Sequence, residues 1–387
     1  MFSVYFSVAV SSFAFVIWTV TWIIQIILNK SFNTNKQLFS EIKYINIFLA
    51  LFFVIEILSR VFAVIPEGAF LTLKSYLLFI IFYVSIIKIN KKEILYKIVI
   101  SILIIVSLLS VYELIRYFVS LKDMPTEVEI NSDRIGFFGY PISMGELKML
   151  LLLMVFPLLF SKEKFFMSKI FLLLLLIPIF ISMYLTQSRN VFVAIFISLI
   201  IYGIIINKKF LIYFATILII FWFIIPARFQ NRIESIANPN FLSNESRLVM
   251  WNVGMQMFKD HPLLGIGDNE FTKVYKLYKE PQIEGEGSHL HSNYLMILAT
   301  TGIFGFIFYI SFFIAIFLKQ IKFYRNVLNE TDKLLIFGSI LMMISFHISG
   351  IFEWNFGDWK VLSVLLFLTS ISFILYNINF NKNLKQE

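Results

Sequence analysis

Long apolar segments follow one another along most of the chain. Each reaches about 18 residues or more, which matches the hydrocarbon thickness of a bilayer and exceeds what a soluble core needs. The pattern therefore predicts an all-α, polytopic integral membrane protein with about eleven transmembrane helices. The predicted spans cover residues 4–28, 45–65, 70–89, 94–121, 143–160, 168–186, 190–206, 210–226, 303–318, 334–352 and 360–377.

One long polar region interrupts this pattern, and it divides the chain into three parts. We expect N-terminal transmembrane helices over 1–226, a large helical extracytoplasmic loop over 227–302 and C-terminal transmembrane helices over 303–387. The opening MFSVYFSVAV lacks the basic residues that begin a cleaved signal peptide. We therefore interpret the first apolar segment as a retained span.

The composition agrees with a membrane protein and excludes several other classes. Hydrophobic residues make up 59% of the chain and charged residues 15%, whereas a soluble domain carries about 25% charged residues. The net charge of +9 comes from short basic stretches between apolar segments, without interleaved aromatics, so nucleic acid is not an expected partner. Cysteine is absent, which excludes disulfides and thiolate metal sites.

The basic residues also predict an orientation. Alternate short loops separate into one set with 18 Lys and Arg and another set with 4. Because lysine- and arginine-rich short loops stay in the cytoplasm, the N-terminus is predicted outside and the C-terminus inside.

Several ionisable residues fall within the predicted spans, mostly in the outer half of the membrane. Each costs at least about 2.5–3.5 kcal/mol at the bilayer centre, so such residues face the protein interior or a wet cavity. Local pairing of Glu56 with Arg60 and of Glu113 with Arg116 along one helix is one interpretation. Their common depth favours the other, a polar cavity open to the outside. The full set is Glu56, Arg60, Lys74, Glu113, Arg116, Glu146, Lys148 and His347.

The polar loop contains an amphipathic helix, predicted over residues 245–260 with Ser243 and Asn244 as possible caps. Its apolar residues recur at helical spacing and would form one face. Such a helix above a polar cavity suits an amphiphilic substrate with a lipid tail; a structural lid is the alternative. The predicted apolar face consists of Leu248, Trp251, Met255 and Phe258.

The stretches SRLVMWNVGMQMFKDHPLLGIGDNEF and HLHSNYLMILATTGIFG resemble the O-antigen ligase and Wzy-type polymerase superfamily. The ligase pattern is His, then Asn, Ser or Gln, then nine residues, then Gly-x-x-Gly. Here His291 and Ser292 are followed by nine residues, then by Gly302 and Gly305. Three further segments fit in order: DRIGFFGYPISMGE, TQSRNVFVA and GIFEWNFGDWKVL. The resemblance covers roughly residues 130–370.

The resemblance implies a GT-C-like fold and a glycosyltransferase that uses an undecaprenyl-diphosphate-linked glycan without a metal or another cofactor. Fixed cations must then stabilise the leaving diphosphate, and the planar arginine fork suits phosphate oxygens better than lysine. Arg189 and Arg247 are the expected catalytic arginines, and Arg134 is expected to bind substrate. A snorkelling anchor at Arg189 and a solvated helix residue at Arg247 are the alternatives.

His291 matches the family's essential histidine, so we expect it to act as the general base or to orient the acceptor. His289, Trp251, Glu353 and Asp358 are expected to contact substrate. Capping would also explain the two carboxylates, and a simple helix-start histidine would explain His291. We predict no metal site, because two histidines two residues apart lie on different helix faces and have no carboxylate at helical spacing.

The sequence therefore favours an O-antigen ligase-type enzyme at the periplasmic face of a bacterial inner membrane. Its expected partners are an undecaprenyl-diphosphate-linked glycan, a lipid A-core or glycan acceptor, and membrane lipids. A Wzy-type polymerase that extends lipid-linked repeats is the close alternative. A transporter or flippase would have ionisable residues at the midplane and internal repeats, which the sequence lacks. A structural subunit of a glycan-assembly complex is the third possibility.

Overall fold

The computed structural model describes residues 40–67, 73–122, 134–135, 138–225, 227–236, 238, 241–279 and 287–383. Within these ranges every regular element is a helix. The α-helices are α3 (Lys43–Val61), α4 (Ile80–Lys88), α5 (Lys92–Lys122), α6 (Pro141–Val155), α7 (Lys169–Leu185), α8 (Arg189–Ile205), α9 (Lys208–Ile224), α10 (Ala227–Glu234), α11 (Leu242–Asp260), α12 (Phe271–Tyr278), α13 (Asn293–Asn326), α14 (Glu330–Phe352) and α15 (Trp359–Asn383). Two short 3-10 helices, η2 (Leu73–Phe79) and η3 (Phe156–Phe160), precede α4 and follow α6.

Six of these helices are long and apolar enough to cross a membrane, and three shorter apolar helices accompany them. The chain is therefore a multi-pass membrane protein, as the apolar pattern predicts. Ten of the eleven predicted spans coincide with α3, η2–α4, α5, α6–η3, α7, α8, α9, α13, α14 and α15. The predicted span over 4–28 lies outside the described residues.

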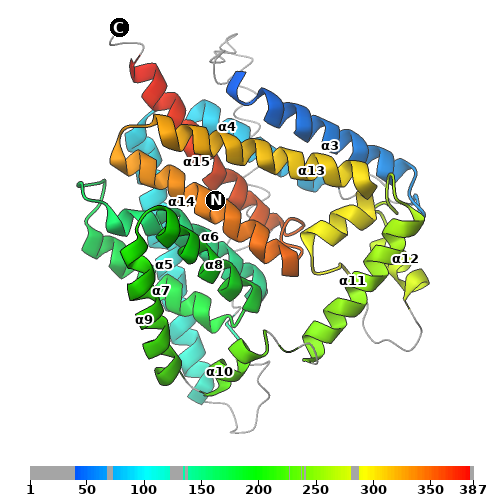
Figure 1. The fold of residues 1–387 in the computed structure, drawn as a ribbon, viewed down its shortest axis with the longest axis horizontal. Helices are drawn as coiled ribbons and strands as arrows, with labels where there is room; N and C mark the ends of the chain where they lie inside the picture. Colours follow the sequence, from blue (N-terminus) through cyan, green and yellow to red (C-terminus); the bar gives the residue numbers. More distant parts are fainter. Residues whose placement is uncertain are drawn as a thin grey trace.

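The central part of the bundle is α14, which packs against α6, α8, α13 and α15. Along its other side α13 lies against α3, and the two run side by side in Figure 1. The helices of the polar region, α10 to α12, lie at the lower and right edges of the view, away from the α13–α14 connection at the left. This arrangement brings the start of α13, the end of α14 and the polar region to one end of the bundle.

Two ion pairs lie inside the bundle, and in each of them the two side chains neutralise one another. Arg60 Nε lies 3.1 Å from Glu56 Oε2, which confirms the predicted pair within α3. Glu113 of α5, however, pairs with Lys148 of α6, and Ser182 of α7 donates to the same carboxylate at 2.6 Å. The predicted local partner of Glu113 is therefore wrong.

Glu113 and Lys148 are almost fully buried against each other, with 1% and 2% of their side chains exposed. They consequently do not line a cavity open to the outside, as their depth suggested. Glu113 and Lys148 lie on different helices, and each finds its partner on the neighbouring helix that buries it. The spacing of residues along one helix does not show a contact of this kind.

Two glycine-containing turns interlock where the polar region meets the bundle. Gly302 has φ +64 and interrupts the helical backbone of α13, and a Cβ there would lie 2.3 Å from the Leu263 carbonyl oxygen. Gly265 has φ +70, and a Cβ there would lie 2.3 Å from the carbonyl carbon of Thr300. The break exposes the Ala299 and Thr300 carbonyls, which accept hydrogen bonds from the amides of Ile266 and Gly267 at 2.9 and 3.0 Å. Only glycine fits this contact without strain.

The amphipathic helix forms as α11, and the side that packs against the rest of the protein is not the apolar face predicted for a helix lying on the membrane. Leu248 is 52% exposed, whereas Val253, Gly254 and Met257 are buried. A Cβ at Gly254 would lie 2.4 Å from a methyl of Leu290, so the glycine allows a close approach to the loop before α13. The closest contact of this face is made by Gly254, which has no side chain, so the apolar pattern of the sequence does not show it.

Candidate active site

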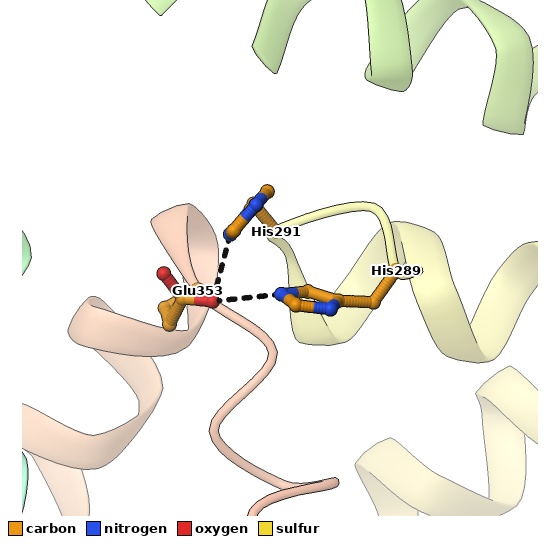
Figure 2. A group of neighbouring side chains, drawn as sticks. All are labelled: His289, His291 and Glu353. Carbon is orange, nitrogen blue, oxygen red and sulfur yellow. Dashed lines mark hydrogen bonds and ion pairs between the residues drawn. The ribbon is translucent and has the colours of Figure 1, made fainter. Parts of the chain in front are cut away.

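Three side chains meet at the end of the bundle that adjoins the polar region (Figure 2). His289 and His291 belong to the loop that precedes α13, and Glu353 directly follows α14. Figure 2 shows both rings directed at the same carboxylate oxygen: His291 Nδ1 lies 2.8 Å and His289 Nε2 3.3 Å from Glu353 Oε1. We call these residues the His–Glu triad. Each histidine side chain is 28% exposed and the glutamate side chain 9% exposed. The carboxylate is therefore held by the protein, while part of each imidazole ring is accessible to solvent.

The backbone around the histidines is held by its neighbours. Trp251 of α11 donates from Nε1 to the Leu290 carbonyl at 3.0 Å, directly between the two histidines. Ser292 caps α13 through the Leu295 amide. His291 itself has φ +47, a left-handed conformation that a residue with a side chain adopts at a cost of about 1–3 kcal/mol. Backbone strain of this kind is concentrated at functional sites.

Arg247 of α11 reaches the other oxygen of the carboxylate, with Nη2 3.4 Å from Glu353 Oε2. Burial alone would raise the pKa of the Glu353 carboxyl. The hydrogen bonds with His289 and His291 and the charge of Arg247 instead hold this pKa below its ordinary value. The carboxylate therefore stays ionised, and it can orient His291 and stabilise a proton on its ring.

Three further arginines gather beside the triad, around the turn between α7 and α8. In this turn Gln187 has φ +51 and the carbonyls point outward to guanidinium groups. Arg134 Nε donates to the Thr186 carbonyl at 2.8 Å, and Arg232 Nε donates to the Gln187 carbonyl at 3.3 Å. Burial, together with the charges of Arg232 and Arg247, lowers the pKa of Arg134 to about 10.

Arg189 begins α8 and is held by the polar region. Its Nη1 donates to the Ser235 carbonyl at 2.9 Å, and its Nη2 donates to the hydroxyl of Ser243. Its guanidinium carbon lies 4.9 Å from the ring centre of Phe241, and that of Arg232 lies 5.8 Å from the same ring. Two cations therefore share one aromatic ring, and their charges interact with those of Arg134 and Arg247. We call these four residues the arginine cluster.

The arginine cluster has an excess of positive charge. Among the described residues, Glu353 is the one carboxylate within ion-pair distance of the cluster, and it contacts Arg247. The other three guanidiniums are held by backbone carbonyls, hydroxyls and a ring, which fix their positions without neutralising them. Four positive charges beside one negative charge give a local excess of positive charge of the kind that suits a multiply charged anion.

A comparison with known protein families agrees with this geometry. Residues 170–310 match the family model described as "O-Antigen ligase". Over these residues the chain is similar to the O-antigen ligase family, which implies a glycosyltransferase-type activity. The matched stretch includes Arg189, Arg232, Arg247 and both histidines of the triad. No curated protein matches the chain.

Arg232 is a member of the arginine cluster that the sequence analysis did not select. In the sequence it stands in the polar stretch after α9, where a basic residue next to a membrane span is ordinary. Arg232 lies on the short polar helix α10, and the residue after that helix, Ser235, is buried only by tertiary packing. Its approach to Arg189 depends on Phe241, a contact that spacing alone does not show.

Behind the triad lies a buried polar network. The Glu146 carboxylate of α6 accepts from Asn190 at 2.8 Å, from Asn355 at 3.3 Å and from Ser349. Asn293, the first residue of α13, donates to Asn355 at 2.5 Å. This network joins α6, α8, α13 and α14 to the segment that begins at Glu353. It accounts for the in-span charge of Glu146.

Asp358 lies at the start of α15 and caps that helix. Its Oδ1 accepts from the backbone amides of Lys360 at 2.8 Å and Val361 at 3.3 Å, and its Oδ2 accepts from the Ser143 hydroxyl. The structure thus gives Asp358 contacts that belong to a helix cap, one of the two interpretations left open by the sequence. Of the predicted site residues, it is the one engaged in capping.

The spacing argument against a metal ion does not apply to this structure. The spacing argument assumed that His289 and His291 lie on a helix. Both residues precede α13, and the centres of their rings are 4.2 Å apart. The argument also found no carboxylate at helical spacing, whereas Glu353 comes from a position 62 residues after His291. The three side chains place one ligand atom each within 4.8 Å of one another.

Proposed function

We propose that this protein transfers a glycan from undecaprenyl diphosphate to an acceptor hydroxyl, as an O-antigen ligase-type glycosyltransferase with lipid A-core as the acceptor. The observation that carries the proposal is the position of the arginine cluster directly beside the His–Glu triad, with Arg247 in contact with Glu353. The arginine cluster suits an anionic leaving group, and the His–Glu triad suits a hydroxyl nucleophile. The match of residues 170–310 to the O-antigen ligase family supports the same pairing.

The arginine cluster would bind the diphosphate and stabilise it as it leaves. When the acceptor oxygen attacks the anomeric carbon, the bond from that carbon to the phosphate oxygen breaks and its electron pair stays on the diphosphate. Preorganised donors aimed at the position where charge develops are the largest single contribution in many enzymes. Arg189 and Arg134 are fixed by carbonyls and hydroxyls before the substrate arrives, which supports this role.

His291 would remove the proton of the acceptor hydroxyl. With Nδ1–H donating to Glu353, the lone pair of Nε2 is free to accept that proton, because a neutral imidazole carries one donor and one acceptor nitrogen. Glu353 then stabilises the positive ring that forms. His289 donates to the same carboxylate and is close enough to contact the acceptor sugar, and Trp251 positions the loop. The proposed mechanism uses no metal ion.

The proposed location is the bacterial inner membrane, with the site facing the periplasm, the N-terminus outside and the C-terminus in the cytoplasm. The support is the distribution of basic residues in short loops, 18 in one set and 4 in the other. The triad and the arginine cluster both lie at the end of the bundle that this rule assigns to the outside.

Purified protein in nanodiscs, with undecaprenyl-diphosphate-linked glycan and with or without lipid A-core, tests the proposal. We expect glycan on lipid A-core only when both substrates are present, and a decrease of about 10²–10⁴-fold in His291→Ala, the usual contribution of a general base. A ladder of longer lipid-linked glycans in the absence of core would identify a Wzy-type polymerase. Lipid-linked sugar that crosses vesicles without any transfer would identify a flippase and reject both enzymes.

A further inference from the structure

The His–Glu triad presents three ligand atoms of the kind that transition metals prefer. His289 Nε2, His291 Nδ1 and Glu353 Oε1 all lie within 4.8 Å of one another. Two imidazole nitrogens and a carboxylate oxygen are the ligand set of many zinc sites that keep an open position. We infer that the triad binds one divalent transition-metal ion of the Zn²⁺ class, and that the bound ion switches off the transfer reaction.

The distances are close to those that a bound ion needs. Ligands at about 2.0–2.2 Å from a tetrahedral ion lie about 3.3 Å from each other. The separation of His289 Nε2 from Glu353 Oε1 is 3.3 Å, and that of His291 Nδ1 from the same oxygen is 2.8 Å. For these two separations an ion requires an adjustment of about half an ångström at His291. The third separation, between His289 Nε2 and His291 Nδ1, is within 4.8 Å, so the two rings must also approach each other where it exceeds the tetrahedral value. Both rings are partly exposed, so an ion can reach them from solvent.

The outer contacts of the triad are those that hold metal ligands in place. The Ser288 hydroxyl lies 3.0 Å from His289 Nδ1, where it can accept the Nδ1–H of a ring that binds an ion through Nε2. Arg247 holds Glu353 Oε2 and the Trp354 amide contacts Oε1 at 3.1 Å, so the carboxylate cannot rotate freely. Partners of this kind fix the tautomer and direction of ligating side chains.

The charge of the arginine cluster limits the affinity. Arg247 neutralises Glu353 in the empty site, and a divalent ion would be repelled by the other guanidiniums. We therefore expect a dissociation constant in the micromolar range, weaker than that of a structural zinc site. Such an affinity suits a reversible inhibitory ion better than a permanent one.

The inhibitory effect rests on the proposed function and follows from the imidazole tautomer. In the metal-free triad, Nδ1–H of His291 donates to Glu353 and Nε2 accepts the proton of the acceptor. A metal ion on Nδ1 displaces that hydrogen and leaves the ring hydrogen on Nε2. His291 then has no free lone pair with which to accept a proton, so the hydroxyl stays unactivated.

The chain is well suited to a direct binding experiment, because it contains four histidines and no cysteine. Full-length protein with a histidine-free tag is titrated in detergent with Co²⁺, whose visible absorption reports its ligands. We expect one bound Co²⁺ with nitrogen and oxygen ligands, and at least tenfold weaker binding in His289→Ala. The matched control is His261→Ala at the end of α11, outside the triad, which should bind Co²⁺ like the parent protein.

Glu353→Gln provides a second variant in case His289→Ala does not fold, and it should lose Co²⁺ binding as well. The thermal unfolding temperature of each variant shows whether it is folded. Absence of Co²⁺ binding in the folded parent protein, or equal binding in the parent and both triad variants, would overturn the metal site.

The transfer assay separates this inference from the proposed function. Micromolar Zn²⁺ should inhibit transfer in the parent protein and in His261→Ala, Mg²⁺ should not, and EDTA should restore the rate. Co²⁺ binding without any transfer under metal-free conditions would leave the metal site in place and reject the enzyme. Metal-free transfer without Co²⁺ binding would do the opposite, and Co²⁺ binding with undiminished transfer would overturn the inhibitory effect.

Discussion

The charged groups of this protein fall into two regions that differ in how they are balanced. Inside the bundle, Lys148 and Glu113 pair with each other and with Ser182, and almost no surface of either is exposed. At the end of the bundle beside the polar region, Arg134 and Arg189 are held by carbonyls and hydroxyls instead of carboxylates. Buried charge that serves stability is paired, whereas the arginine cluster retains its charge.

The difference indicates what each region does. Holding several guanidiniums together without counter-ions costs free energy through mutual repulsion, and nothing in folding requires it. The lowered pKa of Arg134, caused by burial and by Arg232 and Arg247, is one sign of that cost. An anionic ligand would remove the repulsion, so the arginine cluster is best explained as a site that a phosphate-bearing substrate completes.

The largest expected effect is on the balanced region. Glu113→Ala leaves Lys148 buried without its partner, and we expect a loss of about 3–5 kcal/mol of stability. Thermal unfolding in detergent measures it. The double variant Glu113→Ala with Lys148→Met should recover most of the loss, because no unpaired charge remains. An unchanged unfolding temperature in Glu113→Ala would mean that this pair does not stabilise the bundle.

Arg189→Lys should have nearly as large an effect, but on transfer instead of stability. Lysine keeps the charge and loses the planar fork that contacts Ser235 and Ser243 together, so we expect a decrease of about 10²–10³-fold. Arg325→Lys, at the far end of α13, is the matched control and should transfer normally. Near-normal turnover in Arg189→Lys would remove Arg189 from the site.

Arg232→Gln should change stability only a little, and it should raise stability where Glu113→Ala lowers it. Removing one of four repelling charges is expected to raise the unfolding free energy by up to about 1 kcal/mol, while transfer decreases. Thermal unfolding and the transfer assay on the same preparation show both effects. A large loss of stability would mean that Arg232 supports the fold and would remove the contrast between the two regions.

Removing metal ions should have the smallest effect. If guanidiniums supply the positive charge, EDTA leaves the transfer rate unchanged or raises it slightly by clearing the triad. The rate is measured in protein dialysed against EDTA and then in aliquots supplemented with Mg²⁺ or Mn²⁺. Strong inhibition that a divalent ion reverses would show that the arginine cluster does not act alone.

The hydropathy pattern predicted the fold well because each span is a local property of about twenty residues. Ten spans match helices within the described part of the chain, and the span beginning at 303 starts where Gly302 interrupts α13. The side of α11 that packs against the protein was not predicted, because its contact with Leu290 depends on Gly254, a residue with no side chain to detect.

The candidate site was only partly predictable, since it depends on contacts between distant segments. The family motif pointed to His291, Arg189 and Glu353, but not to the triad that joins two of them across 62 residues. The partnership of Arg232 with Arg189 depends on the ring of Phe241. Such contacts arise from tertiary packing and leave no periodic trace in the sequence.

Binding of the lipid carrier tests the central claim most directly. Undecaprenyl diphosphate and undecaprenyl monophosphate share the same tail and differ by one phosphate, so their affinities for the full-length protein in nanodiscs report the headgroup alone. We predict that the diphosphate binds at least about tenfold more tightly, or about 1.4 kcal/mol, and that Arg232→Gln and Arg189→Lys reduce this difference. Equal affinities of the two lipids for the parent protein would contradict a diphosphate site at the arginine cluster.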